Sequence, residues 1–393
     1  MVMKGSQERV TRAFKHQAPD RTPLFEMFQP FHPIHWDICG RTVATDEALY
    51  WDALAEGISW EELTEENARA YFAIHKFFEL DIVHFLPDLP RELPRPQKLG
   101  PGRWLLDGLT YVRDERTKMV VLENAPQQMA DSLKISEEER RREIESWDGS
   151  FVKTSCECPR AFQQVKEMAA AEGLDWVYMG EVGAGTAVAF YPPFQLMWLV
   201  TEPELVRRWI EMVKTQAFYE TQKQISWGCD IIAMGGDVSN DRGPFLSPKL
   251  FRELILPVIQ EHVDLIHRCG AWAVYTSDGN HWPIKEDFFF NSRIDGYAEV
   301  DKAAGMTMER LVEEGIKDRV CILGNVDARH NLCLGTPETV RAETLRCLEL
   351  GLKTPGGHVL HTSHDVHADV KVDNYYAMIA AYREFFGLPP LRL

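Results

Sequence analysis

The segment "SPKLFRELILPVIQEHVDLIHRCGAWAVYTSDGN", residues 247–280, decides the fold because a helix pattern runs directly into a strand pattern. Residues 247–270 begin at a Ser-Pro cap, carry apolar residues at helical spacing and end at Gly270. The apolar run 271–277 has the length of a buried strand and stops abruptly at Asp278. A helix followed by a buried strand is a repeating unit of parallel α/β sheets.

The same unit recurs along the rest of the chain, where short strand-like runs are mostly followed by long helical patterns. Residues 336–351, for example, begin with Thr-Pro and end at Gly351. Right-handed crossovers between such units produce a parallel sheet, and eight units favour a closed (β/α)8 TIM barrel over an open sheet. The predicted strands are residues 22–28, 81–87, 175–181, 230–236, 271–277, 294–299, 320–325 and 358–363.

One region interrupts this alternation. Residues 88–150 read as a proline-rich link, an antiparallel hairpin and a charged helix. We therefore predict a single domain over residues 1–393, with 88–150 as an insertion between the second and third strands that lies outside the barrel.

The composition excludes several classes of protein. The 393 residues carry a net charge of −17, which argues against nucleic acid or an anionic membrane surface as a partner. No run reaches the roughly 18 apolar residues of a membrane span, and residues 1–20 lack the apolar centre of a signal peptide. The eight cysteines form no C-x-x-C pair, so we expect reduced thiols and a cytoplasmic protein.

Polar side chains follow every predicted strand. In barrels of this kind the active site lies at the carboxyl ends of the strands, so these side chains are expected to converge on one mouth. Any single one of them alternatively caps a helix or initiates a turn. In strand order they are Glu26 and Gln29, Asp88, Glu181, Asp237, Asp278, Glu299 and Asp301, Asn325 and Asp327, and His361 and His364.

Aromatic residues gather in the loops after these strands. Phe28, Phe31, His32 and Trp36 follow the first strand. Tyr191 follows a glycine-rich turn after the third strand, and Trp282 follows the fifth. An aromatic mouth with a few acids suits a planar organic ligand, although packing in the core or in a lid is an equal alternative for each ring.

Several motifs, taken in order, resemble the uroporphyrinogen decarboxylase superfamily, which also contains corrinoid-dependent methyltransferases. The resemblance covers nearly the whole chain outside residues 88–150 and implies a TIM barrel. The motifs are "RVTRAFKHQAPDRTPLFEMF" (9–28), "GAGTAVAFY" (183–191), "GDVSNDRGPFLSPKLF" (236–251), "YTSDGN" (275–280), "GNVDAR" (324–329) and "GHVLHTSHDVHADVKVDNYYAM" (357–378).

The resemblance to the decarboxylases themselves is incomplete. It implies catalytic roles for Tyr191 and His364, with Asp369 at the family's offset from that histidine. The two arginines that hold substrate carboxylates in that family fall here on Phe28 and His32. A porphyrinogen with eight carboxylates needs fixed cations, so this loss disfavours a decarboxylase, which we keep as the alternative function.

This sequence also differs from the zinc methyltransferases of the superfamily at the positions of their zinc ligands. Their His-x-Cys after the fifth strand reads Thr276-x-Asp278 here, and their cysteine after the eighth strand reads His364. The soft sulfur ligands are therefore absent. Two alternatives stay open, namely zinc on the harder ligands Asp278, His364 and Glu181, or an acid–base pair that acts without metal.

Our leading hypothesis is a methyltransferase of this superfamily. It would move a methyl group from a small donor, with a methoxylated aromatic compound favoured, to a corrinoid on a partner protein. A barrel without enzymatic activity that binds a corrinoid or tetrapyrrole is a third hypothesis, and a homodimer is left open. The predicted catalytic residues are His364, Asp278, Tyr191 and Asp237, and the predicted substrate-binding residues are Phe28, Phe31, His32, Trp36, Glu181, Trp282 and Asn325.

Overall fold

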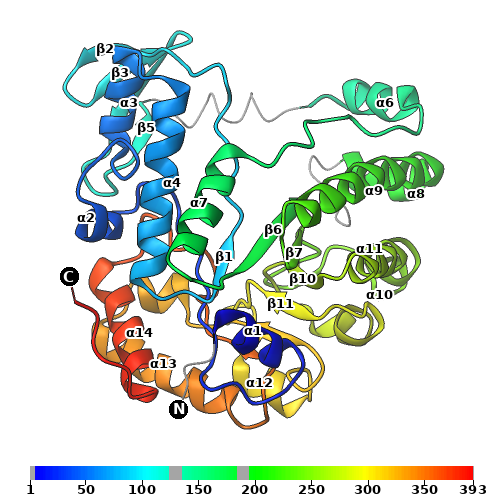
Figure 1. Cartoon of the computed structure of the whole chain (residues 1–393). Coiled ribbons are helices and arrows are strands. Elements are labelled where there is room, and N and C mark those ends of the chain that lie inside the picture. Colours follow the sequence, from blue (N-terminus) through cyan, green and yellow to red (C-terminus); the bar gives the residue numbers. More distant parts are fainter. Residues whose placement is uncertain (1–4, 124–134, 184–193, 393) are drawn as a thin grey trace.

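A curled parallel sheet forms the centre of the molecule (Figure 1). The computed structural model describes residues 5–123, 135–183 and 194–392. Seven strands pair in the order β1-β6-β7-β10-β11-β12-β13, each parallel to its neighbours. Their bounds are β1 (Ile82–His84), β6 (Val177–Gly183), β7 (Ile231–Gly235), β10 (Trp272–Thr276), β11 (Gly296–Ala298), β12 (Cys321–Leu323) and β13 (His358–Val359).

The first predicted strand closes this sheet into a barrel. Leu24 forms a parallel bridge with Leu360, just after β13, and Phe25 forms one with Ile82 in β1. The N–H of Phe25 donates to the carbonyl of Leu360 at 3.0 Å, and the N–H of Asp81 donates to that of Leu24 at 2.8 Å. All eight predicted strand positions are therefore confirmed, and the fold is a (β/α)8 barrel.

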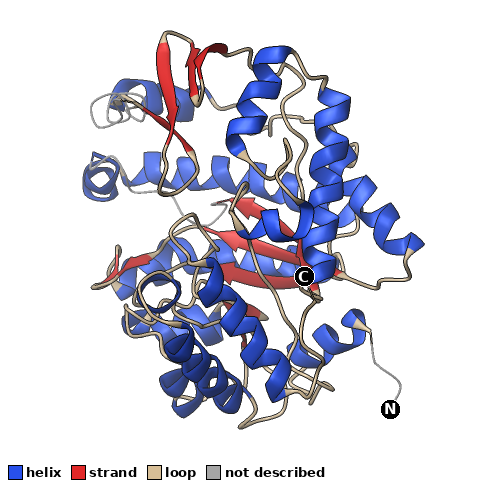
Figure 2. Cartoon of the chain, turned by 90° about the vertical axis from the view of Figure 1, so that its left-hand side faces the viewer, coloured by secondary structure: helices blue, strands red, loops and turns tan. Residues whose placement is uncertain are grey.

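Helices surround the sheet (Figure 2). The predicted helix 247–270 is interrupted, since α10 (Pro248–Leu250) passes into a π turn at Phe251–Ile255 before α11 (Leu256–Arg268). Pro257 lacks the N–H that a regular helix needs there. None of the described helices is long and apolar enough to cross a membrane. The other main helices are α4 (Trp60–Phe77), α7 (Arg160–Ala171), α9 (Pro203–Ser226), α12 (Met308–Glu313), α13 (Pro337–Gly351) and α14 (Val372–Phe385).

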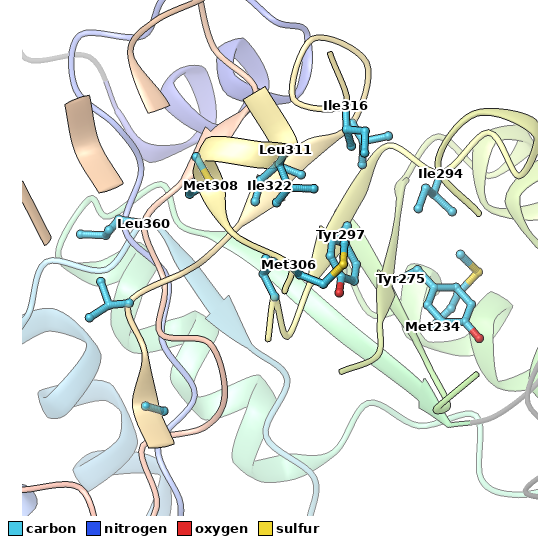
Figure 3. Close-up of a cluster of buried hydrophobic side chains, with 14 of the residues drawn as sticks. Met234, Tyr275, Ile294, Tyr297, Met306, Met308, Leu311, Ile316, Ile322 and Leu360 are labelled. Carbon is cyan, nitrogen blue, oxygen red and sulfur yellow. The ribbon is translucent and has the colours of Figure 1, made fainter. Parts of the chain in front are cut away.

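Alternate side chains of each strand face opposite layers of the core, as the pleat of a strand requires. One layer fills the barrel interior with Phe25, Ile82, Val177, Met179, Ile231, Ala233, Val274, Ala298, Cys321, Leu323 and Val359. The other layer packs under the helices, and Figure 3 shows part of it, with Met234 beside Tyr275 in register and Tyr275 beside Tyr297.

Helix α1 (Ser6–Phe14) closes the amino end of the barrel. Its residues Val10, Ala13 and Phe14 belong to the interior cluster. The N–H of Gly357, just before β13, donates to the carbonyl of Ala13 at 2.8 Å. The carboxyl ends of the strands therefore form the open mouth on the opposite side.

The inserted segment holds four strands rather than one hairpin. They are β2 (Gln97–Gly100), β3 (Arg103–Leu106), β4 (Leu109–Arg113) and β5 (Val120–Leu122), and they form their own antiparallel sheet outside the barrel. The prediction missed the hairpin at Asp107-Gly108, where both residues have positive φ, 51° and 78°. Helix α6 (Glu137–Ser146) follows and begins with a capping box at Ser136.

The inserted sheet is anchored on α3 (Glu47–Glu56). Trp104 is fully buried, and its Nε1 donates to the carboxylate of Asp52 at 3.0 Å. The ring of Trp51 lies 5.7 Å from that of Trp104, between centroids. The insertion thus packs on the helices that follow the first strand, while the single-domain organisation over residues 1–393 stays a prediction.

Candidate active site

A cavity of about 790 Å³ lies at the carboxyl ends of the strands. Asp278 comes directly after β10, Asp301 follows β11, and His364 follows β13, and all three line this cavity. The predicted pair Asp278 and His364 therefore borders one space, as barrel geometry requires of strand ends that face each other across the mouth.

Asp237, which follows β7, supports the turn that holds Asp278. Its carboxylate accepts hydrogen bonds from the backbone N–H of Asp278 and from the hydroxyl of Ser277. Burial raises the pKa of Asp237, whereas these hydrogen bonds and the charge of the nearby His364 lower it, and the effect of burial is the larger. The structure thus brings Asp237 to the site, where it contacts the backbone of the loop.

Burial also raises the pKa of Asp278, and the charges of Asp237 and Asp301 raise it further. His364 and Arg329 oppose this shift. Several carboxylates lie close together here, and their mutual repulsion raises the pH at which some of them lose a proton.

Glu299, at the end of β11, is the group most changed by this crowding. Burial raises the pKa of its carboxyl from 4.5 to about 7; His364 opposes the shift, and Asp365, Asp237 and Asp278 add to it. Its φ of 61° places the residue in the left-handed region. The sequence placed Glu299 only among the strand-end acids and not among the catalytic residues, because burial and neighbouring charges are not visible in a motif.

Two guanidinium groups line the cavity, and each faces a carboxylate. Arg329 lies 3.9 Å from Asp301 and 3.7 Å from Asp241. Arg116, from the turn between β4 and β5, forms an ion pair with Asp369. The motif "GNVDAR" contains Arg329 and offered a signal for it, but nothing in the sequence connects the inserted Arg116 with the barrel mouth.

Glu181 lies in a different place from Asp278 and His364. It borders a second cavity of about 610 Å³, together with Val182 and Trp147. Its carboxylate lies 3.3 Å from Nε2 of His84 on the neighbouring strand β1, and this hydrogen bond lowers the pKa of Glu181. Glu181 therefore does not line the cavity of Asp278 and His364, and its role in substrate binding stays a prediction.

The residues present do not fit the predicted zinc set. Within the described ranges, no three histidine, cysteine, aspartate or glutamate side chains converge as metal ligands. Asp278 and His364 share a cavity, but Glu181 is held by His84 on the adjacent strand. A tetrahedral zinc site needs three or four protein ligands around one point.

The expected aromatic lining is divided. Phe28 and Phe31 line a third cavity, of about 380 Å³, and not the one that contains Asp278. The indole N–H of Trp282 donates to the carbonyl of Gly305 at 2.9 Å, and that of Trp36 donates to Thr45 at 2.7 Å. Buried indoles need such partners, so these two tryptophans pack in the structure instead of lining a described cavity.

Three other predicted residues have different outcomes. His32 is 1% exposed, and its Nε2 donates to the carbonyl of Val370 at 3.0 Å, so it holds a loop in place. Asn325 is 4% exposed and donates from Nδ2 to the carbonyl of Met306 at 2.8 Å. Neither lines a described cavity, and Tyr191 lies outside the described residues.

A buried acid–histidine pair lies within the barrel between the first and last strands. Nδ1 of His361 is 3.0 Å from Oε1 of Glu26, and both side chains are fully buried. Burial alone would lower the pKa of His361, but Glu26 raises it above its usual value. The two strand-end residues thus face each other instead of the cavity.

Comparisons with known proteins agree with this architecture. The family model for uroporphyrinogen decarboxylase (URO-D) matches residues 191–385. The solved structure of a methyltransferase from Methanosarcina mazei aligns with 98% of this chain and 100% of its own, with a TM-score of 0.61 and 18% identity.

A sugar phosphate isomerase/epimerase from Parabacteroides distasonis aligns with 58% of this chain and 77% of its own, with a TM-score of 0.32 and 10% identity. No curated protein sequence matches the chain. The superfamily resemblance carried by the strand-end motifs is confirmed, since residues 191–385 of this (β/α)8 barrel match the uroporphyrinogen decarboxylase (URO-D) family model.

Proposed function

We propose that this protein is a methyltransferase that takes a methyl group from a small donor and transfers it to a corrinoid on a partner protein. One observation carries the proposal: Asp278 and His364 border a single cavity, and Glu299, with a pKa of about 7, interacts electrostatically with both. The fold shared with a solved methyltransferase supports the same reaction class.

The chemistry requires a proton at the departing atom. When a methyl–oxygen bond breaks, the bonding pair stays on oxygen, and an alkoxide or phenoxide is a poor leaving group unless it is protonated. Glu299 holds a proton in a substantial fraction of molecules at neutral pH, and we propose that this proton reaches the departing oxygen through Asp278 or His364, which line the cavity. Asp278 and Asp237 keep that proton on Glu299 through their negative charge.

The partner's corrinoid would supply the strong nucleophile. Among the described lining residues of the main cavity, Cys333 is the one cysteine, and burial raises the pKa of its thiol to about 11. A thiol that keeps its proton is a weak nucleophile. The chain's own residues are thus proposed to bind the donor, orient it and provide the proton.

The proposed donor is a small uncharged methyl ether, with a methoxylated aromatic compound favoured. Arg116 and Arg329 each face a carboxylate, so they do not form the free cation pair that a porphyrinogen with many carboxylates needs. We therefore expect no useful decarboxylation of uroporphyrinogen.

The direct test combines the purified chain, chemically reduced cobalamin and a panel of methoxybenzenes, methylamines and methyl thioethers. We expect loss of the reduced-cobalamin absorbance together with demethylated product from a methoxybenzene. Asp278→Asn and His364→Ala should each lower the rate by roughly 10²–10⁴-fold, the usual range for a general acid or base.

The matched control is Glu138→Gln on α6, an exposed position remote from the cavity lining, which should keep the normal rate. Turnover of uroporphyrinogen without any demethylation would replace this proposal with the decarboxylase alternative. Demethylation at the normal rate in both Asp278→Asn and His364→Ala would remove the roles assigned to those residues.

A further inference from the structure

A separate cavity of about 380 Å³ lies beside the first two strands, between α4 and the loop that follows the first strand. Its walls are rich in aromatic rings, contributed by Phe28, Phe31, Tyr50, Tyr71 and Phe85. An apolar cavity of about 150 Å³ accommodates benzene in another protein, so this volume is sufficient for a substituted aromatic ring.

No aspartate, glutamate, lysine or arginine is among the described residues that line this cavity. Burial lowers the pKa of His35 to about 3 and that of His75 to about 4, so both rings are neutral at pH 7. This lining differs from that of the main cavity, which is rich in acidic residues. A charged ligand would lose its hydration here without gaining a partner of opposite charge.

The imidazole of His35 gives the lining a buried polar atom without a hydrogen-bond partner. His35 is 5% exposed, and its Nε2 is buried without a hydrogen bond to any described residue. Two other polar groups of the lining are satisfied, since Nδ1 of His75 donates to the carbonyl of Tyr71 at 2.7 Å and the hydroxyl of Tyr71 donates to the carbonyl of His84 at 2.6 Å. Buried polar atoms without partners are rare in native proteins.

The ring of Phe28 lies 5.5 Å from that of His35 in an edge-on arrangement. Phe28 also stacks on Phe78 with centroids 5.5 Å apart, so a packed core holds this wall in place. The cavity is therefore largely preformed, as small-molecule sites usually are.

We propose that this cavity is a second ligand site, which takes a small uncharged aromatic molecule whose hydroxyl or carbonyl group bonds to Nε2 of His35. The site is distinct from the main cavity, because the two cavities share none of their described lining residues. The inference goes beyond the proposed methyl transfer and does not depend on it.

Phenol and toluene test the proposal because they share a shape, differ in the hydroxyl group and carry no methyl group on a heteroatom. Isothermal titration calorimetry at pH 7 should show that the protein prefers phenol by roughly 2- to 12-fold, the ratio expected from one neutral hydrogen bond. His35→Phe should remove this preference while it retains toluene binding.

A second variant tests whether the ligands bind inside this cavity, because it reduces the volume of the cavity. Ala70 lies on α4 and lines the cavity, so Ala70→Leu should weaken both ligands by at least about tenfold through overlap with the bound ring. Benzoate should bind at least about tenfold more weakly than phenol, because no lysine or arginine is among the described lining residues. The exposed Glu138→Gln should bind phenol and toluene as the unmodified protein does.

Three results would overturn the proposal. They are the absence of binding by both phenol and toluene, phenol binding that Ala70→Leu leaves unchanged, and loss of phenol binding in Asp278→Asn, which would place the ligand in the main cavity. These three results come from binding measurements, so a failure of the methyl-transfer proposal would not change them.

Discussion

At the scale of single residues, the cluster around Glu299 is defined by charge. Five carboxylates, those of Asp237, Asp278, Glu299, Asp301 and Asp365, interact with one histidine and one guanidinium at the barrel mouth. Mutual repulsion and burial keep a proton on Glu299 at a pH where an ordinary glutamate has lost it. The raised pKa of Glu299 makes the free energy of unfolding depend on pH.

The pH dependence of stability should report on Glu299. Its pKa is 4.5 as an ordinary side chain and about 7 in the fold, so the folded protein binds more protons between these values. Stability is therefore lost as the pH rises through this window, by at most about 3 kcal/mol above pH 7. Glu299→Gln should gain stability relative to the unmodified protein between pH 5 and pH 8, measured by urea unfolding.

A constant difference between the two proteins across that range would show that Glu299 ionises normally. In the methyl-transfer assay, the alkaline limb of the pH–rate profile, which Glu299 sets, should also change. The rate should fall as the pH rises through about 7 in the unmodified protein, and Glu299→Gln should remove that limb.

The buried Glu26–His361 pair is a second prediction at this scale. Glu26→Ala would leave a buried histidine without its acidic partner and should cost roughly 3–5 kcal/mol of unfolding free energy. The exposed Glu56→Ala, at the end of α3, is the control and should change stability by less than about 0.5 kcal/mol. Equal unfolding midpoints for the two variants in urea would contradict the assignment.

At the scale of elements, α1 acts as a plug whose apolar face completes the barrel interior. Val10, Ala13 and Phe14 belong to one buried cluster that includes residues from all eight strands. The ring of Phe14 also lies 5.4 Å from that of Trp272 at the start of β10. The helix thus ties the amino ends of the strands together, while the carboxyl ends stay open for chemistry.

Removal of the Phe14 side chain should destabilise the whole barrel. Phe14 is 3% exposed, and truncation of such a ring to alanine typically costs about 3–5 kcal/mol through lost burial and the cavity that remains. Phe14→Ala should lower the urea midpoint accordingly, whereas the adjacent exposed Lys15→Ala should have little effect. A loss below about 1 kcal/mol would show that α1 is not part of the cooperative core.

At the scale of the whole molecule, the insertion contributes to a site built by the barrel. Its sheet packs on α3 through Trp104, and its β4–β5 turn carries Arg116 to the edge of the main cavity. Arg116 is 74% exposed and pairs with the half-exposed Asp369. A surface pair of this kind contributes little to stability, so its position is the more informative property.

Arg116→Ala should therefore separate binding from folding. We expect a change in unfolding free energy below about 1 kcal/mol, together with a KM for the methyl donor that rises more than kcat falls. Steady-state kinetics and urea unfolding of one preparation give both quantities. A lower kcat at unchanged KM would instead place Arg116 in the chemical step.

The sequence by itself determined the barrel. Strand and helix signals are local, since length, apolar runs and capping residues lie within about twenty neighbouring positions. All eight predicted strands are present, and the motifs at their ends placed Asp278 and His364 on one cavity. The Asp107-Gly108 turn carried an equally local signal, which was missed, and it accounts for the hairpin that the prediction lacked.

Only the tertiary structure decided where each strand-end side chain points and what it meets. Glu181 turned to His84 because β1 and β6 are neighbours, and Glu26 met His361 because the first and last strands close the ring. Tertiary packing likewise placed Phe28 and Phe31 in a separate cavity, whereas the indoles of Trp36 and Trp282 donate hydrogen bonds to backbone carbonyls. Partners, burial and pKa values depend on residues far apart in the chain, and no local pattern encodes them.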